Sequence, residues 1–118
     1  MSSYTENIKA LSRVTATTTS STLDLGQREN ITVHFIGEGV SVGNGVFTVD
    51  ASNDNQNWIT ATAYQDAQST NATTYITSTT ISSNGSKGGR LIPGFQFYRA
   101  KVTVTTDGSY SVIFEGQS

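Results

Sequence analysis

The chain of 118 residues contains no cysteine and only one histidine, one proline and one tryptophan. The absence of cysteine excludes a disulfide framework, a thiolate nucleophile and a thiolate metal site. Charged residues make up 14% of the sequence, and the net charge is −2. Because no block of Lys or Arg could neutralise a phosphate backbone, we expect no nucleic-acid partner.

Long apolar runs are missing as well. No segment approaches the ~18 consecutive apolar residues of a membrane-spanning helix, so we expect no membrane partner. Residues 1–13 lack the apolar stretch of a secretory signal peptide. We therefore expect a protein that is made in the cytoplasm of its host cell and carries no signal peptide.

Threonine and serine are abundant, with 19 and 15 residues. Val, Ile and Thr together number 36, whereas the helix formers Leu, Glu and Lys number only 4, 4 and 3, which excludes an all-helical fold. The length fits a single domain. A chain rich in Ser and Thr can be disordered, but the order of the residues indicates folded β structure.

Several segments alternate between apolar and polar residues, the pattern of a strand with one buried face. The alternation is clear over residues 31–35, 46–51 and 98–105. The last of these is followed by Asp107-Gly108, a dipeptide typical of tight hairpin turns, and by a further alternating segment, 110–114. These residues predict a hairpin near the end of the chain.

Weaker patterns predict further strands over 11–18, 58–64 and 73–81, and turn-forming residues separate the strands at 37–45, 53–57, 66–71 and 84–89. Seven or eight short strands of this kind predict an all-β fold, a single antiparallel β-sandwich or jelly roll. We expect residues 1–22 to be a polar N-terminal arm leading into the first strand, and residues 23–118 to form the sandwich.

Threonine falls largely opposite the apolar residues of the alternating strands, so the outer face of the sheets is expected to be polar but uncharged. Two interpretations remain open. Such a face could dock against neighbouring subunits at little desolvation cost. Alternatively, threonine satisfies strand propensity on a face that stays in water.

A catalytic group is hard to find. His34 is the only imidazole, and the alternation of 31–35 places it on the polar face, as a surface histidine. A general base would need an oriented nucleophile and a carboxylate nearby, and nothing adjacent in the sequence supplies them. We expect a protein that is not an enzyme and that holds no cofactor.

Asp50 and Asp54 are four residues apart, as in the first part of a calcium loop. The EF-hand pattern fails because Asn55 stands where Gly is needed and Ala61 stands where a bidentate Glu is needed. A turn in which Asn and Asp side chains bond to their own backbone explains the segment more simply. We therefore expect no metal.

Trp58 follows this turn, and it has two interpretations. Its ring could stack on a sugar, or it could close one end of the core. If a carbohydrate is bound, the candidate contact residues are Trp58, Tyr64, Asn53 and Asp54.

Two longer segments carry a resemblance to known proteins. Residues 45–58 (GVFTVDASNDNQNW) and 94–104 (GFQFYRAKVTV) have the rhythm of discoidin-like and related carbohydrate-binding sandwiches. With 19–26 (TSSTLDLG) and 104–112 (VTTDGSYSV), the chain is more similar, over roughly 12–115, to small structural proteins of tailed bacteriophage virions. The resemblance implies a capsid decoration (cement) protein, a head-fibre base or a tail-associated module, and it carries no catalytic residues.

The expected function is therefore that of a non-enzymatic virion protein, on the capsid surface or associated with the tail. The first hypothesis is a decoration protein that binds the major capsid protein from outside and stabilises the shell. We expect a homo-oligomer, with a trimer favoured. The alternative is a carbohydrate-binding, host-attachment module of a phage fibre or tail.

Overall fold

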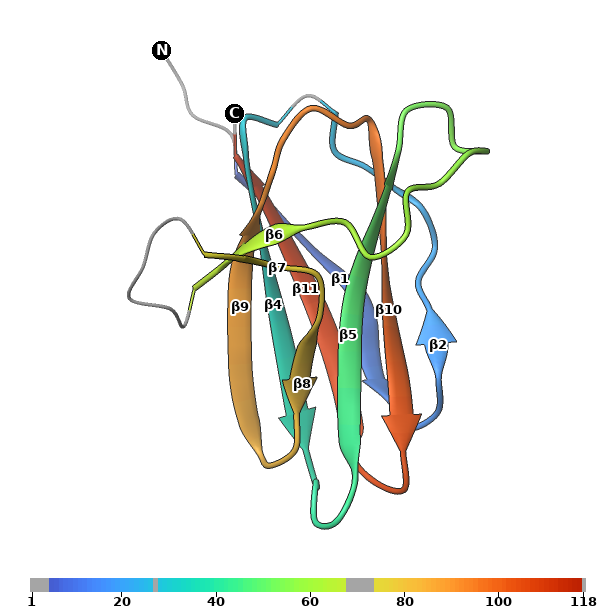
Figure 1. Cartoon of the computed structure of the whole chain (residues 1–118), viewed down its shortest axis with the longest axis vertical. Coiled ribbons are helices and arrows are strands. Elements are labelled where there is room, and N and C mark those ends of the chain that lie inside the picture. Colours follow the sequence, from blue (N-terminus) through green and yellow to red (C-terminus); the bar gives the residue numbers. More distant parts are fainter. Residues whose placement is uncertain (1–4, 27, 68–73, 118) are drawn as a thin grey trace.

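The computed structural model describes residues 5–26, 28–67 and 74–117, which form two antiparallel β-sheets and their connections (Figure 1). In the described part of the chain all regular structure is strand, and no helix is long and apolar enough to cross a membrane. The two sheets are called sheet A and sheet B below. This architecture confirms the predicted all-β sandwich.

Sheet A has six strands, in the order β1 (Thr5–Val14), β11 (Ser109–Gln117), β4 (Asn30–Glu38), β9 (Gly85–Leu91), β6 (Tyr64–Asp66) and β7 (Tyr75–Ile76). Sheet B has the order β2 (Thr18–Thr19), β10 (Phe97–Thr105), β5 (Asn44–Ser52) and β8 (Thr79–Ile81), and β3 (Leu23–Asp24) also pairs with β10. The long strands β4, β5, β10 and β11 form the centre of both sheets, as the alternating sequence segments predicted.

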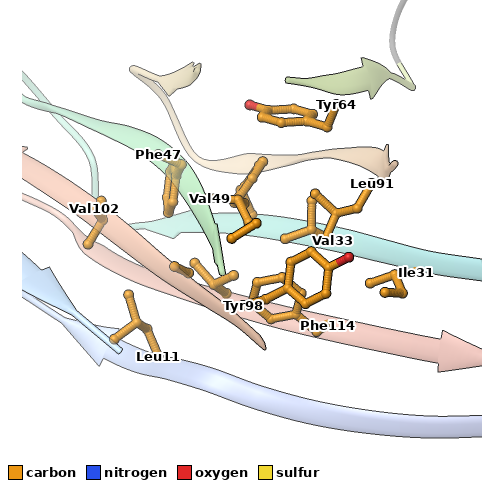
Figure 2. Close-up of a cluster of buried hydrophobic side chains, with 14 of the residues drawn as sticks. Leu11, Ile31, Val33, Phe47, Val49, Tyr64, Leu91, Tyr98, Val102 and Phe114 are labelled. Atoms are coloured by element: carbon orange, nitrogen blue, oxygen red, sulfur yellow. The ribbon is translucent and has the colours of Figure 1, made fainter. Parts of the chain in front are cut away.

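The core lies between the sheets and consists of the inward-facing residues of both (Figure 2). Phe35 of β4 and Phe47 of β5 stack with ring centroids 4.7 Å apart, and this contact joins the two sheets at the middle. Tyr64 lies 5.9 Å from Phe35, and Tyr110 meets Phe47 edge-on at 5.9 Å. All four rings are fully buried. The aromatic cluster therefore fixes the position of one sheet against the other.

The turn predicted at Asp107-Gly108 is present, since β10 ends at Thr105 and β11 begins at Ser109, but the predicted hairpin is wrong. The two strands do not pair with each other: the turn crosses from sheet B to sheet A, where β10 pairs with β5 and β11 pairs with β4. The Asp107 carboxylate accepts backbone N–H bonds from Ser41 at 3.2 Å and Gly43 at 2.9 Å. These bonds hold the pKa of Asp107 below its usual value. They tie the β4–β5 loop to the β10–β11 turn at one end of the sandwich.

Two further sequence predictions about strands were wrong. Most of the predicted strand over 58–64 is a loop, because only Ile59 forms a bridge, to Ala51, before β6 begins at Tyr64. The predicted polar arm is wrong for residues 5–14, because they form β1, which pairs along β11 in sheet A. Ile8, Ala10 and Leu11 pack against or within the core, and these few apolar residues were enough to anchor the strand. Residues 1–4 lie outside the described part of the chain.

We predict that Phe35→Ala lowers the free energy of unfolding by about 3–5 kcal/mol, because it leaves a cavity where the two sheets meet. Urea unfolding followed by tyrosine and tryptophan fluorescence measures the loss. Thr103→Ala, on an exposed position of β10, is the control and should change stability by no more than about 0.5 kcal/mol. A loss of less than about 1 kcal/mol for Phe35→Ala would contradict the role given to the aromatic cluster.

Candidate functional site

The loop between β5 and β6 contains most of the residues that the sequence singled out. It follows the edge of β5, where Ile59 exchanges two backbone hydrogen bonds with Ala51 and the Thr62 N–H bonds to the Val49 carbonyl. This pairing holds the loop in place and carries Trp58 to the outer face of sheet B. Ile59 is itself about half exposed, at 52%.

Trp58 lies against Arg99 rather than in the core. The Arg99 guanidinium carbon is 4.1 Å from the centroid of the Trp58 ring, and Arg99 Nε donates to Asp50 Oδ2 at 2.9 Å. The other Asp50 oxygen accepts the Ala61 N–H at 3.1 Å. Asp50 is buried although it points outward from β5, so this ion pair is shielded from water by Trp58 and the loop. The interpretation of Trp58 as the end of the core is therefore wrong, and one face of its ring is already occupied by Arg99.

Asn53 and Asp54 form the turn that the sequence predicted. The Asp54 carboxylate accepts the backbone N–H groups of Gln56 and Asn57 at 2.9 and 2.8 Å and the Asn57 side-chain amide at 2.7 Å. These bonds, those of Asn57 first, hold the pKa of Asp54 well below its usual range. Asn53 Oδ1 accepts the Gln96 N–H at 3.3 Å. Both side chains are thus engaged by their own chain, and within the described residues no group of three potential ligands could hold a metal.

Tyr64 is a correction to the candidate residues. Its side chain is fully buried, and its hydroxyl shares a hydrogen bond with that of Thr79. Burial raises its pKa. Tyr64 therefore offers no surface to a ligand and belongs to the aromatic cluster of the core.

The outer face of sheet B away from Trp58 is uncharged except for Lys101. Val46 of β5 stands between Thr80 of β8 and Thr103 of β10, its partners in the two ladders. The same face includes Asn44, Thr48, Lys101 and Thr105, which share the outward register. We call the surface formed by Asn44, Val46, Thr48, Thr80, Lys101, Thr103 and Thr105 the threonine face. Apart from Lys101 it matches the uncharged outer face predicted from the sequence, but the prediction is wrong for sheet A, whose outer face carries Lys9, Arg90 and Glu115.

Sequence reasoning missed the exposed aromatic residue Tyr75. This residue begins β7 and is 54% exposed, and it lines a hollow of about 250 Å³ together with Gln65, Arg90 and Pro93. The weak pattern over 73–81 predicted a strand but not which residue would face outward. His34, in contrast, is exposed on the outer face of sheet A, as its place in the alternation predicted.

Comparison with known proteins adds a likeness of fold. No family model and no curated protein matches the sequence. The structure is similar to the crystal structure of the SPBc2 prophage-derived protein YomS, with a TM-score of 0.77. The likeness covers 100% of this chain and 96% of that chain, at 16% sequence identity. The same sandwich therefore accounts for nearly the whole of both chains.

We predict that Asp54→Asn lowers the free energy of unfolding at neutral pH, because it removes the charge that the turn N–H groups stabilise. A carboxylate whose pKa is depressed by folding stabilises the protein above its unfolded pKa of about 3.9, and this contribution is lost as the pH falls below that value. The difference between wild type and variant should therefore shrink below about pH 4 in urea unfolding.

The control for this prediction is Glu38→Gln, because Glu38 makes only a 4.0 Å, solvent-exposed contact with Arg13. Its stability should follow that of the wild type across the same pH range. A rise in the melting temperature of the wild type on adding CaCl2, lost in Asp54→Asn, would instead indicate a calcium site.

Proposed function

We propose that the protein is a non-enzymatic structural protein of a phage particle, a decoration protein that binds the major capsid protein from outside. The observation that carries the proposal is the threonine face, a β surface whose residues include a single charged side chain, Lys101. The likeness of fold to a prophage-derived protein, which extends over the whole chain, supports a phage origin.

Docking through the threonine face has a physical rationale. Removing charges from water is costly, whereas threonine hydroxyls can exchange water for hydrogen bonds to a partner, and the methyl groups of Thr and Val contribute apolar area. Thr48, Thr80 and Thr103 surround Val46 in this way. Across a sandwich strand the backbone is rigid, so little conformational entropy is lost on binding.

The use of the polar side chains supports a role without catalysis. Asp50, Asp54 and Asp107 each hold an arginine or backbone N–H groups in place. His34 is exposed, and its neighbours across the sheet are Ile113 and Gly88. These direct ladder partners carry no carboxylate or hydroxyl to orient the imidazole, as a general base would need, and Thr32 and Glu115, which line the same depression, belong to the neighbouring row.

The alternative proposed from the sequence, a carbohydrate-binding module, loses the residues on which it was based. Tyr64 is buried, Asn53 and Asp54 serve the turn, and Trp58 covers Arg99. What favours carbohydrate binding now is the hollow beside Tyr75, on a different part of the surface.

We predict that the protein is present in many copies in particles purified after infection or prophage induction of the source strain. Mass spectrometry and cryo-electron microscopy should find it on the shell exterior. Its absence from purified particles would overturn the proposed function.

The double variant Thr80→Glu/Thr103→Glu tests docking by the threonine face. Its affinity for particles that lack the protein, measured by co-sedimentation, should fall by about tenfold or more, because binding would remove two carboxylates from water. Ser86→Glu, an exposed position on the outer face of sheet A, is the matched control and should bind like the wild type. If both proteins sediment equally, another surface carries the docking. Melting temperatures of both variants verify that they fold.

We further propose that the protein forms a closed homo-oligomer, with a trimer favoured, since few surface charges oppose self-association. Sedimentation equilibrium should give a mass of three times the 12.6 kDa of one chain. A 12.6 kDa species throughout the micromolar range would contradict a trimer in solution.

A further inference from the structure

The outer face of sheet A differs from the threonine face in its chemistry. One row of residues crosses the whole sheet, because each is the ladder partner of the next: Asn7, Glu115, Thr32, Arg90, Gln65 and Tyr75. The row contains an amide at each of two positions, a carboxylate, a hydroxyl, a guanidinium and a phenol. The neighbouring row begins with Lys9 and continues through Ile113, His34 and Gly88.

Two hollows lie along these rows. A depression of about 580 Å³ is lined by residues that include Asn7, Thr32, His34, Ile113 and Glu115. It forms where Gly88 has no side chain, between His34 and the end of β6. The smaller hollow of about 250 Å³ lies beside it, since Arg90 in its wall is the ladder partner of Thr32.

The smaller hollow has an aromatic wall. Tyr75 is 54% exposed, and Ile92, which also lines the hollow, is 45% exposed. Gln65 and Arg90 add an amide and a guanidinium from the strands beside it. Figure 1 shows β6 and β7 lying across the direction of β9, so the sheet turns at this edge.

We propose that these two hollows form a binding site for a neutral oligosaccharide. The apolar face of a sugar ring packs on an exposed aromatic ring, which Tyr75 provides. Sugar hydroxyls need both donors and acceptors, and planar amide, guanidinium and carboxylate groups offer these in pairs that match vicinal hydroxyls. Gln65 and Arg90 present such groups beside the aromatic ring, and Glu115 presents one in the larger hollow.

The charges of the site favour a neutral ligand. Glu115 and Arg90 are two ladder positions apart, and they balance each other along the row. One donor of Arg90 is already used, since its NH2 group bonds to Asn30 Oδ1 at 2.6 Å. An acidic polysaccharide would bring charges that Glu115 repels, and Arg90, the cation in the wall of the smaller hollow, already faces Glu115 along the row. The apolar side chains of Ile113 and Ile92 in the walls also suit sugar rings better than ions.

The site is independent of the docking surface, because it lies on the other sheet. If the threonine face binds a shell, the two outer faces of the sandwich point in opposite directions, and the oligosaccharide site is left open to the surroundings. Binding of sugar by the isolated protein therefore tests this proposal whether or not the protein decorates a capsid.

The test is a glycan array that carries neutral and acidic oligosaccharides, followed by NMR titration of the ¹⁵N-labelled protein with the hexasaccharides of cellulose, chitin, starch and mannan. We expect binding to one neutral class, with amide shifts confined to the strands of sheet A that line the two hollows, β1, β4, β6, β7, β9 and β11. Tyr75→Ala and Arg90→Ala should each weaken binding about tenfold or more, while Tyr75→Phe, which keeps the ring, should retain most of it.

Two further variants act as controls. Thr103→Glu, on the threonine face, should bind sugar like the wild type. Trp58→Ala tests the site first suggested by the sequence and should also leave binding unchanged. Loss of binding in Trp58→Ala but not in Tyr75→Ala would overturn the proposal in favour of sheet B. Preference for acidic glycans, or no binding to any probe at about 5 mM, would overturn it outright, since a site with a Kd near 1 mM would then be largely filled.

Discussion

The two-residue period of the β-strand is the constraint on which the rest of this structure depends. Each long strand must send one set of side chains inward and the next outward, so a single sequence pattern specifies both the core and the surface. The inward set converges on Phe35 and Phe47, which stack between the sheets. The outward sets remain free to differ, and they do: sheet B carries threonine, whereas sheet A carries amides, a guanidinium and a carboxylate.

Three carboxylates of this protein stabilise its loops and turns. Asp107 joins two loops at one end of the sandwich, Asp54 shapes the turn after β5, and Asp50 holds Arg99 beneath Trp58. These three carboxylates are therefore engaged by the chain itself. Glu115 and Glu38 differ from them, because each lines an open hollow on sheet A.

The sequence was a good guide to the long strands themselves, because alternation is a property of neighbouring residues. The alternation of 31–35, 98–105 and 110–114 predicted β4, β10 and β11. It did not predict how they pair, because the turn at Asp107-Gly108 joins β10 of one sheet to β11 of the other, and β11 pairs with the distant strand β4. It failed at β1, because a strand on the edge of a sheet needs few apolar residues and its partner, β11, is almost a hundred residues away. It also failed at Trp58, because a large ring beside a turn packs equally well inside a core or over a cation.

The sequence by itself determined the fold class, the threonine-rich character of one outer face and the small number of candidate catalytic groups. Composition and the alternation of neighbouring residues do not depend on which strands pair. Only the tertiary structure decided which polar side chains bond within the fold and which lie together on an outer face. Tyr64 and Tyr75 illustrate this: both lie in short, weakly patterned segments, yet one is buried against Thr79 and the other lines a hollow with Arg90. The reason is that strand pairing between distant segments, β6 with β9 and with β7, sets which side of the sheet each residue occupies.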